Sequence, residues 1–142
     1  MIILDTNVIS ACMRPDINGP VMSWLGAQPP RQIWTTTINI FELRYGIEGP
    51  IEPEFRARLE AAWREFGDVI FEHRILPFDG PAANAAAVLA GKRRGKIRDV
   101  GMRDTFIAGI AIAHGAVIAT RNLRDFKDAG VPLIDPWKNG AV

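Results

Sequence analysis

The feature that most limits how this chain can fold is a set of short, continuous apolar segments separated by longer segments of helical character. A strand buried on both faces shows no polar alternation, so a run such as Ile2-Ile3-Leu4 is typical of a parallel sheet covered by helices. Segments of this kind lie at 2–4, 33–36, 74–78, 117–120 and 131–134. Helices are expected at 8–13, 21–25, 39–45, 54–66, 80–94 and 105–113, with a turn or short helix at 122–127. The pattern predicts a three-layer α/β/α domain with a mainly parallel central sheet.

The whole length fits one domain. At 142 residues the chain can bury a substantial core but is too short for two ordinary domains. It has no repeat, low-complexity tract or linker, so residues 1–142 are expected to form a single unit. The net charge is only +1, so any affinity for nucleic acid must come from local patches or bound cations.

The sequence contains no signal for export or membrane insertion. The apolar run after Met1 ends at Asp5, which is too short for a signal peptide. The longest apolar stretch, 106–113, is far below the ~20 residues that span a bilayer. Cys12 is the single cysteine, which excludes an intrachain disulfide and suits a reducing compartment. We expect a cytoplasmic protein without a membrane anchor.

Polar residues follow two of the expected strands. Asp5, Thr6 and Asn7 come after the first strand, and the cluster at 120–122 ends the strand at 117–120, with Asp125 three residues further on. Ligands of open parallel sheets bind at the carboxyl ends of the strands. The side chains of Thr120, Arg121 and Asn122 are therefore expected beside those of residues 5–7.

Two further acids lie beside apolar segments. Asp104 directly precedes the helix expected at 105–113, and Glu42 lies inside the helix at 39–45. Acidic side chains are costly to bury unless they are paired or bind a metal. Together with Asp5 and Asp125 they would form a hard-oxygen site for Mg²⁺ or Mn²⁺, of the kind used on phosphate esters.

Each acid also has a purely structural interpretation. Asp5 and Asp125 are typical helix-cap or turn residues, and Glu42 alone is typical of a solvated helix face. Asp104 could simply be an acid at the start of a helix, where the helix dipole stabilises negative charge. Residue properties alone leave these alternatives open.

The order and setting of the motifs resemble a known family. The carrying segments are 1–10 (MIILDTNVIS), 41–46 (FELRYG), 74–79 (RILPFD), 104–108 (DTFIA), 119–122 (ATRN) with Asp125-Phe126, and 135–137 (DPW). Over essentially its whole length the chain resembles the PIN-domain ribonucleases, and within them the VapC- and FitB-like toxins of type II toxin–antitoxin systems.

This resemblance implies a function and a set of site residues. Asp5, Glu42, Asp104 and Asp125 match the catalytic, metal-binding acids of the family. The positions that match polar residues around the metal and substrate are Thr6, Asn7, Thr120, Arg121 and Asn122. The family implies an endoribonuclease that uses Mg²⁺ or Mn²⁺, binds a cognate antitoxin and forms a homodimer.

The chain departs from the family pattern near the third acid. Many relatives have a small residue after that acid, where this chain has Thr105 followed by Phe106. Asp99 is an additional acid that competes with Asp104 for the third position. We favour Asp104 because it directly precedes the buried helix, whereas Asp99 lies in a polar loop.

Two other features, a basic segment and an apolar stripe, have alternative interpretations. The basic segment 91–96 fails the spacing of a phosphate-binding loop, and it is either an RNA-backbone contact or a solvated helix end. The apolar stripe of the helix at 54–66 is core, a dimer face or an antitoxin groove. His73 and His114 have no signal that pairs them for acid–base catalysis.

Other functions fit an acidic α/β domain less well. A receiver-like phosphoacceptor domain usually has adjacent acids after the first strand, where this chain has Thr6-Asn7 after Asp5. A structure-specific DNA nuclease needs extra helical elements for which the chain has no room. A catalytically dead PIN-like binding module is disfavoured because all four acids are retained.

Overall fold

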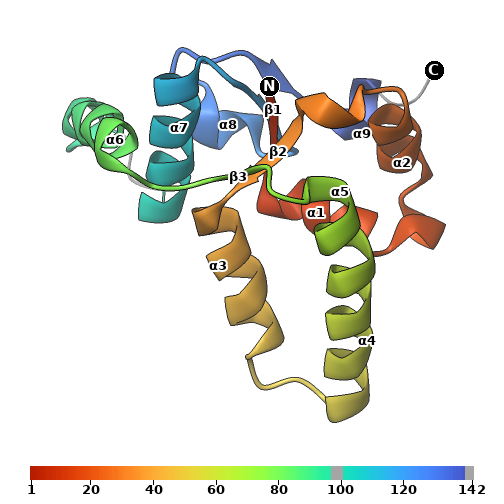
Figure 1. Cartoon of the computed structure of the whole chain (residues 1–142). Coiled ribbons are helices and arrows are strands. Elements are labelled where there is room, and N and C mark those ends of the chain that lie inside the picture. Colours follow the sequence, from red (N-terminus) through yellow and green to blue (C-terminus); the bar gives the residue numbers. More distant parts are fainter. Residues whose placement is uncertain (97–100, 140–142) are drawn as a thin grey trace.

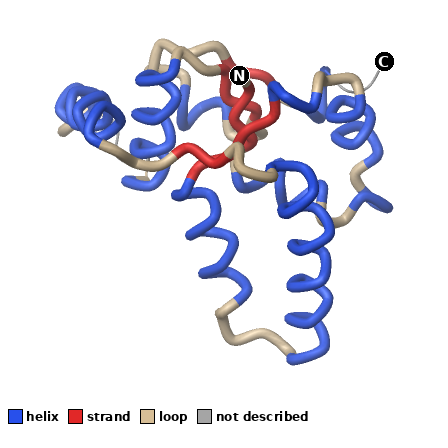
Figure 2. Tube along the Cα trace, in the orientation of Figure 1, coloured by secondary structure: helices blue, strands red, loops and turns tan. Residues whose placement is uncertain are grey.

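A computed structural model describes residues 1–96 and 101–139. Within these residues the centre is a five-stranded sheet (Figures 1 and 2). Its strand order is β3-β2-β1-β4-β5, and all neighbouring strands are parallel. The strands are β1 (Ile2–Leu4), β2 (Ile33–Thr36), β3 (Ile75–Leu76), β4 (Val117–Ala119) and β5 (Leu133–Ile134). Because β1 lies between β2 and β4, the residues that follow these strands become neighbours. The main-chain N–H of Asp5 donates to the carbonyl oxygen of Ala119 at 3.0 Å.

Helices cover both faces of the sheet (Figure 2). They are α1 (Thr6–Cys12), α2 (Gly19–Gly26), α3 (Thr37–Ile47), α4 (Pro53–Trp63), α5 (Val69–Phe71), α6 (Gly80–Arg93), α7 (Met102–His114), α8 (Leu123–Phe126) and α9 (Pro136–Asn139). Short 3-10 turns occupy Pro15–Ile17 and Pro30–Gln32. No helix in the described ranges has the length and apolarity needed to cross a bilayer.

The core has two halves, one on each face of the sheet. Successive residues of a strand point to opposite faces. Leu4 packs in a cluster with side chains of α1, α2 and α5, whereas Ile3 packs with those of α6, α7 and α8. In β4, Ala119 packs in the same cluster as Leu4, and Ile118 packs in the same cluster as Ile3. Both faces are covered, so the predicted three-layer α/β/α architecture with a parallel sheet is confirmed.

Helix ends follow the sequence signals. Thr36 and Asp79 cap α3 and α6 by accepting a hydrogen bond from a main-chain N–H of the first turn. Gly115 ends α7 with φ of 59°, a backbone conformation that glycine adopts without strain. The strand expected at 74–78 is shorter than predicted, because Pro77 has no N–H to extend the pairing beyond Leu76.

The helix expected at 54–66 differs from the prediction. α3 and α4 run away from the sheet and back toward it, and α4 ends at Trp63, followed by a π-helical turn at Arg64–Asp68 (Figure 1). A Cβ atom on Gly67 would lie 2.8 Å from the Trp63 ring, so glycine permits the indole to lie against this turn. The turn buries Phe66, while no residue of α4 itself is fully buried.

Two apolar side chains of α4, Phe55 and Leu59, face a cavity rather than the core. Phe55 and Leu59 line a cavity of about 290 Å³ together with Leu43 and Ile47 of α3. Of the predicted stripe, Phe66 is fully buried, and Trp63 packs against the core cluster as a partly buried side chain.

Candidate active site

The buried centre of the site is the carboxylate of Asp5, directly after β1. Its side chain is only 4% exposed. Oδ1 accepts hydrogen bonds from the main-chain N–H of Thr6 at 2.8 Å and from Nδ2 of Asn39 at 3.2 Å. Oδ2 accepts from Oγ1 of Thr120 at 2.7 Å and from Nδ2 of Asn7 at 3.1 Å. Burial raises the pKa of Asp5, and these four donors oppose that shift by stabilising the charged form.

Asp5 also occupies the N-cap position of α1. The structural interpretation from sequence is therefore correct for this residue. A cap needs one donor, however, and three further side-chain donors from α1, α3 and the residue after β4 converge on the same carboxylate. Capping alone does not account for this network.

Asn39 is a site residue that the sequence analysis did not single out. It is fully buried, and its Nδ2 donates both to Asp5 and to Oγ1 of Thr6, the latter at 3.1 Å. Thr36 fixes it, because the Thr36 hydroxyl donates to Oδ1 of Asn39 at 2.6 Å and accepts from its main-chain N–H. A signal was present, since Asn39 follows the cap residue by three positions and precedes Glu42 by three on one face of α3.

Glu42 extends the network toward solvent. Its Oε1 accepts a hydrogen bond from Oγ1 of Thr6 at 3.0 Å, and its Oε2 lies 3.9 Å from Nε of Arg103. Partial burial raises the pKa of Glu42, and the charge of Asp5 raises it further. The hydroxyl of Thr6 and the guanidinium of Arg103 act in the opposite direction.

Asp104 lies half-buried in the first turn of α7. Burial and then the charges of Asp5, Asp125 and Glu42 raise the pKa of Asp104 to about 6. Asp104 is therefore within electrostatic range of the other three predicted acids.

The four acids do not form a ready-made ligand set. Among residues 1–96 and 101–139, no three His, Cys, Asp or Glu side chains approach closely enough to hold one metal ion together. The chemistry of the donors nevertheless fits a divalent cation, because carboxylate oxygens are the hard ligands that Mg²⁺ and Mn²⁺ prefer. Such a cation would offset the negative charges of Asp5, Asp125 and Glu42, which raise the pKa of Asp104.

The predicted polar residues mostly belong to the internal network. Asn7 also donates to Oγ1 of Thr120 at 3.2 Å, and its Oδ1 accepts from the main-chain N–H of Arg121. The main-chain N–H of Asn122 donates to Oγ1 of Thr120 at 3.0 Å. Arg121 differs, because its guanidinium is exposed and lies 4.2 Å from the ring centre of Trp137.

The basic segment at 91–96 divides into exposed and buried residues. Lys92, Arg94 and Lys96 are exposed, whereas Arg93 is 5% exposed and forms an ion pair with Asp128. Both sequence interpretations, an RNA contact and a solvated helix end, are wrong for Arg93. Asp99 lies outside the described residues.

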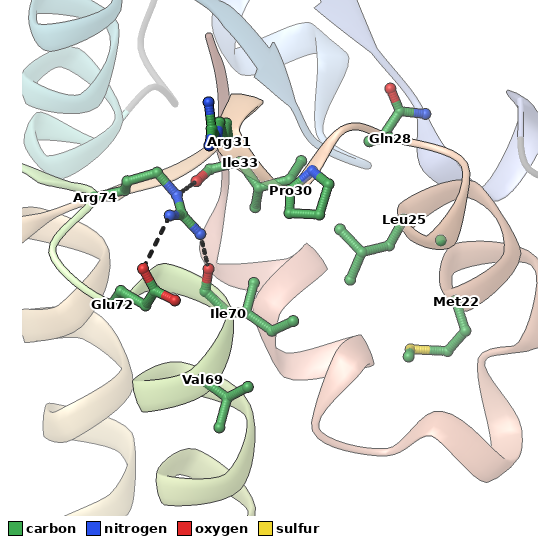
Figure 3. A pocket seen from close by; sticks show the side chains of 11 residues that line it. Met22, Leu25, Gln28, Pro30, Arg31, Ile33, Val69, Ile70, Glu72 and Arg74 are labelled. Atoms are coloured by element: carbon green, nitrogen blue, oxygen red, sulfur yellow. Dashed lines mark hydrogen bonds and ion pairs between the residues drawn. The ribbon is translucent and has the colours of Figure 1, made fainter.

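A large cavity lies away from the acids. It has a volume of about 690 Å³, and its lining includes Ile33 at the amino end of β2 (Figure 3). One of its two arginines, Arg74, donates to the carbonyl oxygens of Ile33 and Ile70 and faces Glu72 (Figure 3). Because these main-chain contacts hold the guanidinium in place, we assign Arg74 a structural role and place the candidate site at the opposite edge of the sheet.

The fold and the site together define a class, the α/β/α domains with an acidic cluster at the carboxyl ends of parallel strands. The sequence model of the PIN domain matches residues 2–132, so the chain belongs to the PIN-domain family. The resemblance seen in the sequence motifs is confirmed, and family membership excludes the receiver-like alternative.

Individual relatives match over nearly the full length. A VapC ribonuclease of Sinorhizobium fredii is 35% identical over 97% of this chain and 99% of its own. The toxin FitB of Neisseria gonorrhoeae is 32% identical over 96% of this chain and 99% of its own. The crystal structure of FitAcB from the same species is similar with a TM-score of 0.85 and 32% identity, covering 96% of this chain and 99% of that chain.

Proposed function

We propose that this chain is the ribonuclease toxin of a toxin–antitoxin pair and hydrolyses RNA phosphodiester bonds with four acids around Mg²⁺ or Mn²⁺. The acids are Asp5, Glu42, Asp104 and Asp125. The observation that carries the proposal is their convergence, since Asp104 lies within range of the charges of the other three. Like charges in a half-buried site repel one another, and a divalent cation removes that repulsion. Similarity to a VapC ribonuclease and to the toxin FitB supports the same conclusion.

The residues of the chain have distinct roles in this proposal. A divalent cation bound among the acids would supply activation of water and charge neutralisation at the phosphate. Asp5 offers a carboxylate fixed by four donors, and the Thr6 hydroxyl orients Glu42. Arg121, exposed and held over Trp137, is placed to contact a substrate phosphate.

We propose a cognate antitoxin as the protein partner, a homodimer as the assembly and the cytoplasm as the location. FitAB bound to a DNA fragment is similar to this chain with a TM-score of 0.84 and 31% identity. Phe41 and Tyr45 of α3 are exposed and stack on each other, with their ring centres 5.9 Å apart. Exposed aromatic side chains of this kind favour burial in a protein interface.

The test is cleavage of a mixed RNA pool with Mg²⁺, Mn²⁺ or EDTA by wild type, Asp104→Asn and Asp5→Asn. Asp104→Asn is the easier variant to interpret, because an amide at position 5 would place an NH₂ group against the NH₂ donors of Asn7 or Asn39. We expect metal-dependent cleavage by wild type and a loss of at least about 100-fold in both variants. The matched control, Asp16→Asn, changes an exposed acid of the Pro15–Ile17 turn and should retain full activity.

Full activity of Asp104→Asn, in preparations free of contaminating nuclease, would refute the site. Cleavage that is unaffected by EDTA would refute the role of the metal. A wild-type protein that neither cleaves RNA nor binds Mn²⁺ would instead be a catalytically dead PIN-like binding module.

A further inference from the structure

One buried guanidinium connects the segments that carry two of the four acids. Arg93, at the end of α6, binds the carboxylate of Asp128 through Nε at 2.8 Å and Nη2 at 2.6 Å. Nη2 also donates to the main-chain carbonyl oxygen of Asp125 at 2.8 Å. Nη1 donates to Oγ1 of Thr105 at 3.0 Å. Thr105 directly follows Asp104 in the first turn of α7, so the guanidinium contacts both acid-bearing segments.

The pair with Asp128 alone would join α6 to the segment after α8. The two remaining contacts have a different consequence, because they fix the main chain at Asp125 and the side chain next to Asp104. A buried cation is costly unless its donors are satisfied, and the planar fork of arginine satisfies several acceptors at fixed angles. A lysine ammonium at the same place carries the charge but cannot reach all three acceptors with that geometry.

We propose that Arg93 is a positioning residue that sets the placement of Asp104 relative to Asp125 and so tunes the divalent-metal affinity of the site. This inference rests on the proposed function, because it assumes that these acids bind a metal. Partners outside the ligand set that orient metal ligands typically alter affinity by about 10- to 100-fold.

The test compares Arg93→Lys and Arg93→Met with matched changes at the exposed neighbour, Arg94→Lys and Arg94→Met. Mn²⁺ binding is titrated well below the unfolding temperature, so that only folded protein is measured. We expect a Kd for Mn²⁺ about tenfold weaker in Arg93→Lys and weaker still in Arg93→Met, with both Arg94 variants within about twofold of wild type.

A second readout needs no metal. Hydrogen exchange of the metal-free protein should become faster at 101–106 and 122–128 in Arg93→Lys, while β1 and β4 keep their protection. If the Arg93 variants do not fold, Asp128→Asn replaces them. Asp128 is 33% exposed, and its loss should release the guanidinium and weaken Mn²⁺ binding severalfold.

The outcomes separate the two proposals. Faster exchange with unchanged Mn²⁺ affinity would make Arg93 merely structural and overturn the inference. Unchanged exchange at both segments would also overturn it. A wild type that binds no Mn²⁺ refutes the proposed metal site as well, whereas a wild type and an Arg93→Lys variant that bind Mn²⁺ equally refute only the positioning role.

Discussion

The carboxylate of Asp104 faces three other acids from a half-buried position in α7. Its pKa of about 6 in the folded protein lies above the ordinary value of 3.8. Protons therefore bind the folded chain more tightly than the unfolded chain at this residue. In metal-free protein its contribution to stability is largest below about pH 4 and declines as the pH rises through 6.

We expect Asp104→Asn to stabilise the metal-free protein at pH 7.5 while it abolishes cleavage. Replacing a charge that the fold disfavours should raise the free energy of unfolding by about 1 kcal/mol after allowance for solvent screening, or roughly 4 °C in Tm. The gain should shrink as the pH falls toward 4, because Asp104 is then protonated in the folded protein and partly protonated in the unfolded chain. Thermal melts with EDTA between pH 4 and 8 measure both effects. A variant less stable than wild type at pH 7.5 would show that Asp104 makes a packing or hydrogen-bond contribution larger than the repulsion.

Single residues were predictable where the signal was local. The acids at 5, 42, 104 and 125 stand out by their position after strands or beside apolar helices, although their catalytic role stays a prediction. Asn39 and Arg93 were missed because their partners are distant in sequence. Asn39 lies 34 residues from Asp5, and Arg93 lies 35 residues from Asp128. No local pattern reveals such contacts.

The packing of α6 against α7 depends on one close approach. A Cβ atom on Gly109 of α7 would lie 2.6 Å from the carbonyl oxygen of Ala82 and from Cβ of Ala86. Both neighbours belong to α6, and the nearest atoms include main chain that cannot rotate away. Glycine at this position in the middle of α7 lets the two helices meet, and α7 carries Asp104 in its first turn.

We expect Gly109→Ala to destabilise the protein by about 1–3 kcal/mol, because the added methyl forces the helices apart. The control is Gly91→Ala on α6, where an added Cβ meets nothing within 4 Å. That change should stabilise the helix by about 0.5–1 kcal/mol. Urea unfolding followed by circular dichroism measures both. Equal stability of the two variants would mean that α6 and α7 adjust without cost.

Elements were predictable in type but not always in extent. Caps and glycine stops located both ends of α6 and the C-terminal end of α7 well, whereas α7 begins at Met102, three residues before the expected start, so that Asp104 lies inside the helix. The π-helical turn after Trp63 was not foreseen, because it depends on the indole lying against Gly67 and on Phe66 and Phe71 meeting edge to face in the core. Tertiary packing of this kind leaves no period in the sequence.

Across the whole molecule, the four acids come from four separate segments: the end of β1, then α3, α7 and α8. A cation bound by all of them would link elements from both sides of the sheet. We therefore expect Mn²⁺ to raise the Tm of wild type by several degrees, since a ligand at 100 times its Kd contributes about 2.7 kcal/mol. EDTA should reverse the shift, and Asp104→Asn should lose most of it.

The control for that melt is NaCl at equal ionic strength, because salt also screens repulsion between acids. An equal rise with NaCl would show screening without binding.

The layered architecture and the parallel sheet were predictable from the apolar runs alone, whereas the strand order required the three-dimensional structure.

The central place of β1 between β2 and β4 has a consequence for biosynthesis. Asp5 is synthesised before its hydroxyl partner Thr120, and before Asp104 and Asp125. A nascent chain that has not yet released residues 104–125 has Asp5 and Glu42 but lacks the other two acids and Thr120. The acidic cluster is therefore completed only after residue 125 has emerged from the ribosome.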